Sequence, residues 1–170
     1  MEYMRTLKDK SVSLAIVDPE YGIGADEKNS VKKLQSKKSA SLSKNYGSQR
    51  WDGDTPEDNY FNELFRVSKN QIVWGANNFQ LPPSEYFLCW NKKQALPNFA
   101  SLEYAWVSSG LKKPAKLFTY SIHKHNQVGK VHPTQKPIPL YRRILEVYAK
   151  PGQLILDTHV GSASSLIACE

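Results

Sequence analysis

The sequence has no long hydrophobic run and few cysteines, and each shortage excludes a class of protein. No apolar run approaches the roughly 18 residues of a membrane-spanning helix, and the first residues lack the apolar core of a signal peptide. The two cysteines, Cys89 and Cys169, form no Cys-x-x-Cys pair, which argues against a disulfide framework or a zinc knuckle. The four histidines show no metal-ligand spacing, so we expect no metal site. We therefore predict a single soluble, cytoplasmic domain over residues 1–170.

Positive charge dominates, with a formal net charge of +7 at pH 7. Clustered lysines and arginines gain affinity for DNA or RNA by releasing phosphate counterions, so a nucleic-acid partner is indicated. Residues 25–50 are basic, serine-rich and without apolar periodicity, which predicts a long mobile loop. A solvated charged loop is the plainer interpretation, and a loop that becomes ordered on nucleic acid is the alternative. The candidate nucleic-acid contacts are Lys32, Lys33, Lys37, Lys38 and Lys92.

Short apolar runs alternate with helical patterns along the chain. Strands are predicted over residues 11–17, 71–74, 86–90, 103–107, 116–120 and 154–156, and helices over 56–67, 137–148 and from about 162. Thr55 is the expected N-cap of the first helix. This order predicts an α/β sandwich with a mainly parallel central sheet. Ligands of such sheets bind beyond the carboxyl ends of the strands, where residues 18–21 and 157–162 stand.

The first of these sites is the stretch VDPEYGIG, residues 17–24. The Asp18 carboxylate and the Pro19 carbonyl can accept hydrogen bonds from an exocyclic amine, and Tyr21 offers a ring for stacking on a base. A strand end followed by a turn, with the tyrosine as a packing lid, is the plainer interpretation. The residue types favour a pocket for an amino-bearing base.

The second site is LILDTHVGSAS, residues 154–164. Asp157 can hold an amine or a hydroxyl, and backbone N–H groups near Gly161 and Ser162 suit a carboxylate or phosphate. A nucleotide that carries an amino acid would satisfy both. A tight strand-to-helix connection that uses glycine only for its geometry is the alternative.

Three motifs together resemble those of a known family. Asp-Pro-Glu-Tyr at 18–21 resembles the Asp-Pro-Pro-Tyr motif of amino-group DNA methyltransferases, and HPTQKP at 132–137 matches a segment that precedes their cofactor-binding strand. DTHVGSAS at 157–164 falls where the family has Asp-Pro-Phe-x-Gly-Ser-Gly. This order resembles the permuted beta class, which is common in phages and in bacterial restriction-modification systems.

The resemblance implies a Rossmann-like sheet flanked by helices, with S-adenosylmethionine as the cofactor and DNA as the partner. It implies direct methyl transfer to N6 of an adenine flipped out of the duplex. Cytosine N4 or an RNA base as the acceptor, and a non-catalytic nucleic-acid-binding remnant, are the alternatives. Carried over by motif, the catalytic residues are Asp18, Pro19 and Tyr21, and the cofactor-binding residues are Asp157, Gly161, Ser162, Thr134, Gln135 and Lys136.

The carboxyl-terminal part is shorter than the family pattern. Family members continue for two more strands after the strand at 154–156, whereas this sequence stops at Glu170. We therefore expect a fragment or a shortened form, with that strand at a sheet edge that a homodimer or a missing segment covers. Residues 108–131 stand where the family carries a target-recognition region and would be a short version of it.

Overall fold

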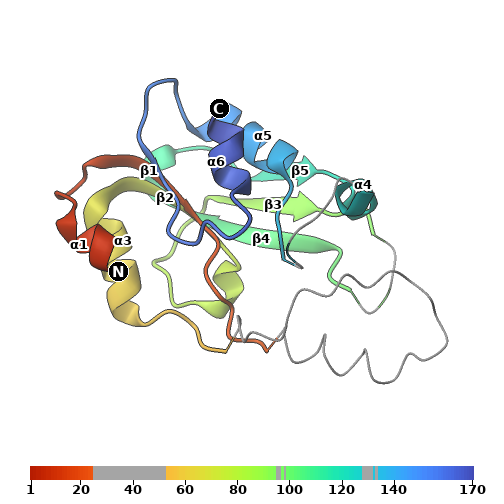
Figure 1. Cartoon of the computed structure of the whole chain (residues 1–170), viewed down its shortest axis with the longest axis horizontal. Coiled ribbons are helices and arrows are strands. Elements are labelled where there is room, and N and C mark those ends of the chain that lie inside the picture. The colour runs from red at the N-terminus through yellow and green to blue at the C-terminus, as the bar shows by residue number, and fades with distance from the viewer. Residues whose placement is uncertain (25–52, 95–96, 98, 128–131, 133) are drawn as a thin grey trace.

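The computed structural model describes residues 1–24, 53–94, 97, 99–127, 132 and 134–170 (Figure 1). The basic stretch predicted to be a mobile loop, with Lys32, Lys33, Lys37 and Lys38, lies outside the described residues. No described helix combines the length and apolar character that a bilayer crossing needs.

Within the described residues, six strands form one sheet with the order β5-β3-β4-β2-β1-β6. Their bounds are β1 Val12–Val17, β2 Ser68–Trp74, β3 Phe87–Asn91, β4 Leu102–Val107, β5 Lys116–Thr119 and β6 Ile155–Leu156. Parallel ladders join β1 to β2, β1 to β6 and β3 to β5. Strand β4 runs antiparallel to both β2 and β3. The mainly parallel sheet is thus present, with one reversed strand at its centre and β6 at an edge.

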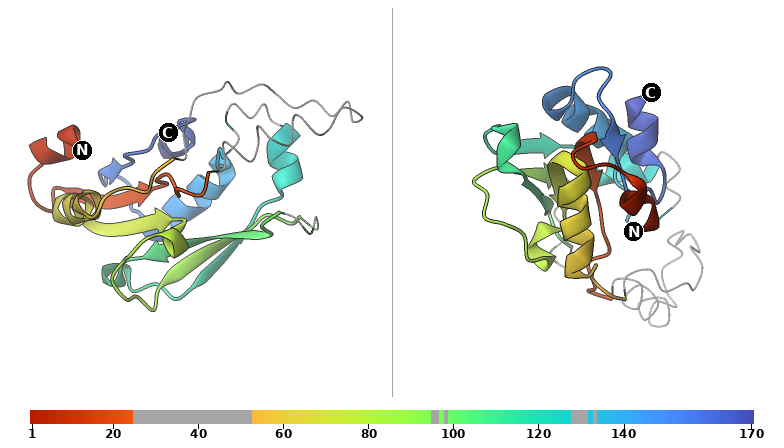
Figure 2. Two further views of the ribbon diagram at one scale, coloured as in Figure 1. Left: turned by 90° about the horizontal axis from the view of Figure 1, so that it is seen from below. Right: turned by 90° about the vertical axis from the view of Figure 1, so that its left-hand side faces the viewer.

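Helices cover both faces of this sheet. They are α1 Glu2–Thr6, α3 Asp58–Val67, α4 Ile122–Gln127, α5 Ile138–Tyr148 and α6 Ser164–Cys169, with 3-10 turns η1 Ala76–Asn78 and η2 Ser109–Leu111. Side chains of β1 alternate between two hydrophobic clusters, with Val17 in the cluster of α3 and Ile16 in that of α5. Figure 1 shows α5 beside α6, away from α1 and α3, and Figure 2 shows the same arrangement from two further sides.

The helix boundaries follow the predictions with one correction. Helix α3 begins at Asp58 with Glu57 as its N-cap, so the expected cap at Thr55 was wrong by two residues. Glu57 is the last residue with extended backbone, and its carbonyl accepts the first helical hydrogen bond, from Tyr60. Helix α5 starts directly after Pro137, as predicted. The short helices α1 and α4 were not predicted.

Candidate active site

Strand ends from five strands meet at one edge of the sheet. Asp18 follows β1, Gly75 follows β2 and Asp157 follows β6. These three strands run parallel, so the three residues lie at the same end of the strands. Lys92 follows β3, which runs in the same direction. Glu103 lies at the start of β4, and the reversed direction of that strand brings its beginning to the same edge.

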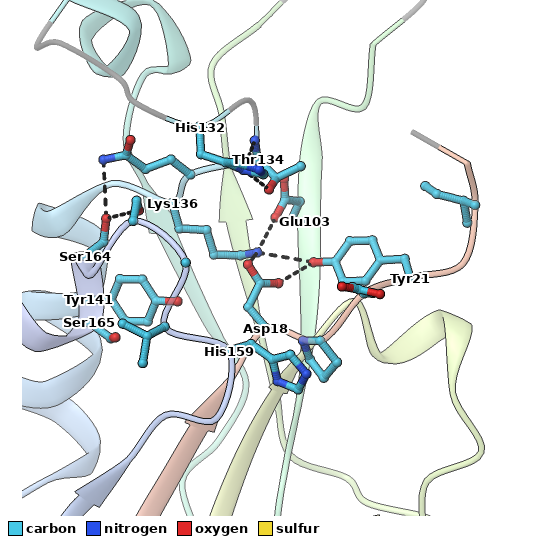
Figure 3. Close-up of a pocket in the computed structure, with 17 residues that line it drawn as sticks. Asp18, Tyr21, Glu103, His132, Thr134, Lys136, Tyr141, His159, Ser164 and Ser165 are labelled. Atoms are coloured by element: carbon cyan, nitrogen blue, oxygen red, sulfur yellow. Dashed lines mark hydrogen bonds and ion pairs between the residues drawn. The ribbon is translucent and has the colours of Figure 1, made fainter. Parts of the chain in front are cut away.

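A cavity of about 440 Å³ opens at this edge and is lined by all three sequence motifs (Figure 3). Residues 18–21 contribute one wall, residues 132 and 134–136 a second, and residues 159–162 with the start of α6 a third. The predicted neighbours, remote in sequence, therefore line one pocket. Among the predicted site residues that the structure describes, Asp157 and Lys92 do not line it, whereas the others do, namely Asp18, Pro19, Tyr21, Thr134, Gln135, Lys136, Gly161 and Ser162.

The Asp18 carboxylate is engaged on both oxygens. The Tyr21 hydroxyl donates to Oδ1 at 2.8 Å, and the Lys136 ammonium lies 2.5 Å from Oδ2. Lys136 Nζ also donates to the Tyr21 hydroxyl oxygen at 3.2 Å. In Figure 3 these three side chains converge in the pocket from the end of β1, the loop after it and the segment before α5. Asp18 is thus held in one orientation by two donors.

Lys136 sits in a row of alternating charges. Its ammonium is 3.2 Å from Glu103 Oε2, and Glu103 Oε1 is 2.5 Å from the Lys92 ammonium. Only 3% of the Lys136 side chain is exposed, and its ammonium lies 5.0 Å from the centroid of the Trp74 ring. Burial by itself lowers the pKa of Lys136, but Asp18 and Glu103 outweigh it and raise that pKa well above the ordinary value. Lys136 is therefore a buried, charged lysine at neutral pH.

Glu103 was not among the predicted site residues, and its charge has a measurable consequence. Burial raises its pKa, but Lys136 and Lys92 outweigh that effect and hold the pKa below its ordinary value. A lowered carboxyl pKa contributes stability above the unfolded pKa, and that stability is lost as the pH falls through the folded one. Glu103→Gln is therefore expected to lower the Tm at pH 7, with the difference from wild type shrinking below about pH 4. Melting curves followed by circular dichroism would measure this, and a difference that is constant with pH would contradict it.

Asp157 organises the turn that forms the third wall. Its Oδ1 accepts the backbone N–H of His159 at 2.9 Å, and its Oδ2 accepts the Ser165 hydroxyl at 2.5 Å. Burial raises the pKa of Asp157, and these two donors offset part of the rise. Gly161, within the turn, has a φ of +49°, which favours glycine. The Asp157 carboxylate therefore fixes the turn at 159–162 without lining the cavity itself.

The segment before α5 is tied to two helices. The buried ring of His125, in α4, donates through Nε2 to the carbonyl of Gln135 at 2.7 Å. The Gln135 side-chain amide donates to Ser164 Oγ of α6 at 3.4 Å. His125 had no assigned role in the sequence, since nothing near it in the chain indicates that it holds this segment. Its position makes it part of the support of the pocket.

Tyr21 packs its ring against backbone. Gly75 has a φ of +65°, and a Cβ atom at this position would overlap the Tyr21 ring. Phe79 meets the same ring edge-on at 6.3 Å between centroids. A glycine directly after a buried strand was the only signal in the sequence for this contact. Stacking of Tyr21 on a base stays a prediction, as does a nucleic-acid contact for Lys92, whose ammonium here pairs with Glu103.

Comparison with known proteins matches residues 55–170 to a family, and this range contains the motifs at 132–137 and 157–164 but not the one at 18–21. The family model described as DNA methylase matches residues 55–170. Over 58 residues the chain is 36% identical to type II methyltransferase M.HpaI of Haemophilus parainfluenzae, covering 34% of this chain and 18% of that protein. Over 115 residues it is 29% identical to type II methyltransferase M2.DpnII of Streptococcus pneumoniae, covering 68% of this chain and 38% of that protein. The chain thus spans well under half of the length of these relatives.

Solved structures share the fold at low sequence identity. The crystal structure of the M1.HpyAVI–SAM complex aligns with a TM-score of 0.54 at 18% identity, covering 98% of this chain and 80% of that one. A Thermus thermophilus protein described as a DNA modification methylase aligns with a TM-score of 0.53 at 14% identity, covering 98% of this chain and 79% of that one. These likenesses confirm the predicted α/β methyltransferase fold. The family match over residues 55–170 shows that this chain belongs to the N6/N4 DNA methylase family.

Proposed function

We propose that this chain is a DNA methyltransferase that acts on the N6 amino group of adenine, with S-adenosylmethionine as the methyl donor. The observation that carries the proposal is the single pocket that joins Asp18 and Tyr21 to the turn at 159–162. An amine acceptor and a cofactor-type turn must lie side by side for such a transfer, since the reacting atoms have to be brought into contact. The cavity volume of about 440 Å³ is in the usual range for small-molecule sites.

The pocket walls fit S-adenosylmethionine chemically. Hydroxyl groups of Thr134, Ser162 and Ser164 line the cavity and can bind the carboxylate and amine of the methionine end. M1.HpyAVI, which shares the fold, was solved as a complex with this compound. When bound, S-adenosylmethionine supplies an electrophilic methyl group. The residues that would hold it here are Gly161 and Ser162, on a turn that Asp157 fixes, together with Thr134 and Gln135.

Asp18 would be the residue that orients the acceptor. Its carboxylate, with the Pro19 carbonyl, accepts hydrogen bonds from the two N–H groups of an exocyclic amine, and the nitrogen lone pair is then directed at the methyl group. Tyr21 would stack on a base that is flipped out of the duplex. The new nitrogen–carbon bond would replace the sulfur–carbon bond of S-adenosylmethionine, and the amine proton would leave to water. Adenine is favoured because the motif begins with Asp-Pro.

DNA as the partner is supported by the family and by the basic charge. The net charge of +7 favours a polyanion, and Lys32, Lys33, Lys37 and Lys38 would be the phosphate contacts, with Lys92 beside the base pocket. Residues 108–131 would form a short target-recognition segment. A second chain or segment along β6 would cover the sheet edge.

The proposal is tested by nucleoside analysis. Plasmid DNA from a host without DNA methylases is incubated with the protein and S-adenosylmethionine, hydrolysed and analysed by mass spectrometry. The expected product is N6-methyl-2′-deoxyadenosine. N4-methyl-2′-deoxycytidine would replace adenine by cytosine as the acceptor, and an RNA control would show whether DNA is the polymer used. The absence of any methylated nucleoside would contradict the proposal.

Asp157→Ala is expected to weaken S-adenosylmethionine binding by about tenfold or more, because the pocket turn loses two hydrogen bonds of its carboxylate anchor. Isothermal titration calorimetry measures the affinity. Asp54→Ala, an exposed carboxylate outside this pocket, is the matched control and is expected to bind as wild type does. Unchanged affinity in Asp157→Ala would remove this residue from cofactor binding.

A further inference from the structure

Asp18 carries an ion pair that the proposed reaction does not need. The Lys136 ammonium lies 2.5 Å from Oδ2, on the carboxylate that has to accept the target amine. The ion pair is largely removed from solvent, since 3% of the Lys136 side chain and 19% of the Asp18 side chain are exposed. A hydrogen-bond donor of the protein thus already occupies the acceptor oxygen.

The Lys136 ammonium and the target amine compete for the Asp18 carboxylate during methyl transfer. An amine nitrogen that receives a methyl group becomes positively charged, and a lysine ammonium on the same carboxylate repels that charge. Repulsion is strong in a buried pocket, where water screens little. Transfer should therefore be faster when the ammonium moves away from Asp18 than when it stays.

Glu103 offers the ammonium a second carboxylate. Glu103 Oε2 is 3.2 Å from Lys136 Nζ, on the far side of the ammonium from Asp18. A lysine stem is flexible enough to shift a short distance without leaving its burial site. Lys92, 2.5 Å from Glu103 Oε1, neutralises part of the charge of Glu103 and so limits its pull on Lys136. The row of four charges can therefore hold Lys136 at either carboxylate.

We propose that the Lys136 ammonium binds the Asp18 carboxylate in the free protein, in the place of the target amine. When the base enters, the ammonium leaves Asp18 and keeps its ion pair with Glu103. This inference rests on the proposed function. Glu103 is then a positioning residue for the reaction, acting through Lys136. Asp18 then binds the amine of the base, and Glu103 binds the displaced ammonium. Glu103 thus takes part in the reaction although it lies outside all three sequence motifs.

Kinetics of two variants test this assignment. Glu103→Gln removes the alternative carboxylate, so kcat/KM for DNA is expected to fall by about tenfold or more, with S-adenosylmethionine affinity within about twofold of wild type. Adding Lys136→Met to that variant removes the competing ammonium, and the double variant is expected to be faster than Glu103→Gln alone. A residue that only supports the fold could also regain stability in the double variant, because both charges of the pair are then removed. Rates are therefore compared at a temperature where every variant is fully folded, and faster transfer there supports the assignment.

The matched control is Glu63→Gln. The Glu63 side chain has the same 24% exposure as Glu103 and also pairs with a basic residue, Arg66, but it lies on α3 outside the pocket. Its kcat/KM is expected to equal that of wild type. Melting curves confirm that each variant is folded at the assay temperature. Wild-type rates in Glu103→Gln, or a folded double variant that is no faster than Glu103→Gln, would overturn the assignment.

A second measurement does not depend on turnover or on the folding of the double variant. The Lys136 ammonium signal in ¹H–¹⁵N spectra is expected to shift when 2′-deoxyadenosine is added to the wild-type protein, and to shift differently in Glu103→Gln. An unmoved signal would overturn the inference. A wild type that shows this shift but makes no methylated nucleoside would overturn the proposed function alone, so the two failures are distinguishable.

Discussion

Asp18→Ala is expected to lower kcat/KM for DNA by about a thousandfold or more, while S-adenosylmethionine affinity stays within severalfold of wild type. The carboxylate is the group that would orient the acceptor amine, and in the structure it contacts both Tyr21 and Lys136. The cofactor turn at 159–162 is anchored by Asp157 and not by Asp18. The variant should therefore bind cofactor and fail in transfer.

The control for this variant is Asp9→Ala. The Asp9 side chain is 76% exposed and pairs with Arg66 at the surface, outside the pocket lining. Transfer is measured with tritiated S-adenosylmethionine, and binding by calorimetry. Melting curves are needed as well, because Asp18→Ala leaves the buried Lys136 with Glu103 as its one ion-pair partner among the described residues. Retained turnover in a folded Asp18→Ala protein would exclude Asp18 from the mechanism.

Gly75→Ala is expected to have the second largest effect, on both stability and activity. The backbone there has a φ of +65°, which costs a non-glycine residue about 1 kcal/mol or more. The new methyl group would also overlap the Tyr21 ring and force it to move. Together these effects should destabilise the fold by about 2–4 kcal/mol. Displacing Tyr21 from Asp18 should also lower transfer by about tenfold or more.

Gly152→Ala separates the two causes. Gly152 also has a positive φ, +80°, but a Cβ atom there would have no neighbour within 4 Å. It therefore reports the cost of the backbone conformation alone, with unchanged transfer. Chemical denaturation measures stability, and the tritium assay measures transfer. If Gly75→Ala is no more harmful than Gly152→Ala, the Tyr21 contact is not important for the site.

Most of the fold could be predicted because burial patterns are local. Continuous apolar runs such as 14–17 and 72–74 indicate strands buried on both faces, and Pro137 with Pro139 marks the start of α5. Strand direction is not local. The residues at 102–107 fit a parallel strand and an antiparallel strand equally well. The antiparallel placement of β4 was therefore not predictable from them.

Site residues within a recognisable sequence motif were predictable. Those that reach the site only through the fold were not. Asp18 and the 159–162 turn are recognisable in the chain, and two adjacent parallel strands bring them together. Glu103 joins the pocket only because β4 is reversed, and no short-range pattern encodes its pairing with Lys136. The loop motif identified Lys136 as a cofactor contact, yet in the structure its ammonium binds the proposed catalytic carboxylate. Long-range ion pairs of this kind depend on topology.

The central claim is that one pocket holds both the methyl donor and the acceptor base. A crystal structure of the protein with S-adenosylmethionine tests it most directly. The account predicts the methionine end against residues 134, 135, 161 and 162, with the sulfonium methyl facing Asp18. Cofactor bound in the adjoining cavity lined by Glu57 and Asn59, or a methyl group turned away from Asp18, would contradict it.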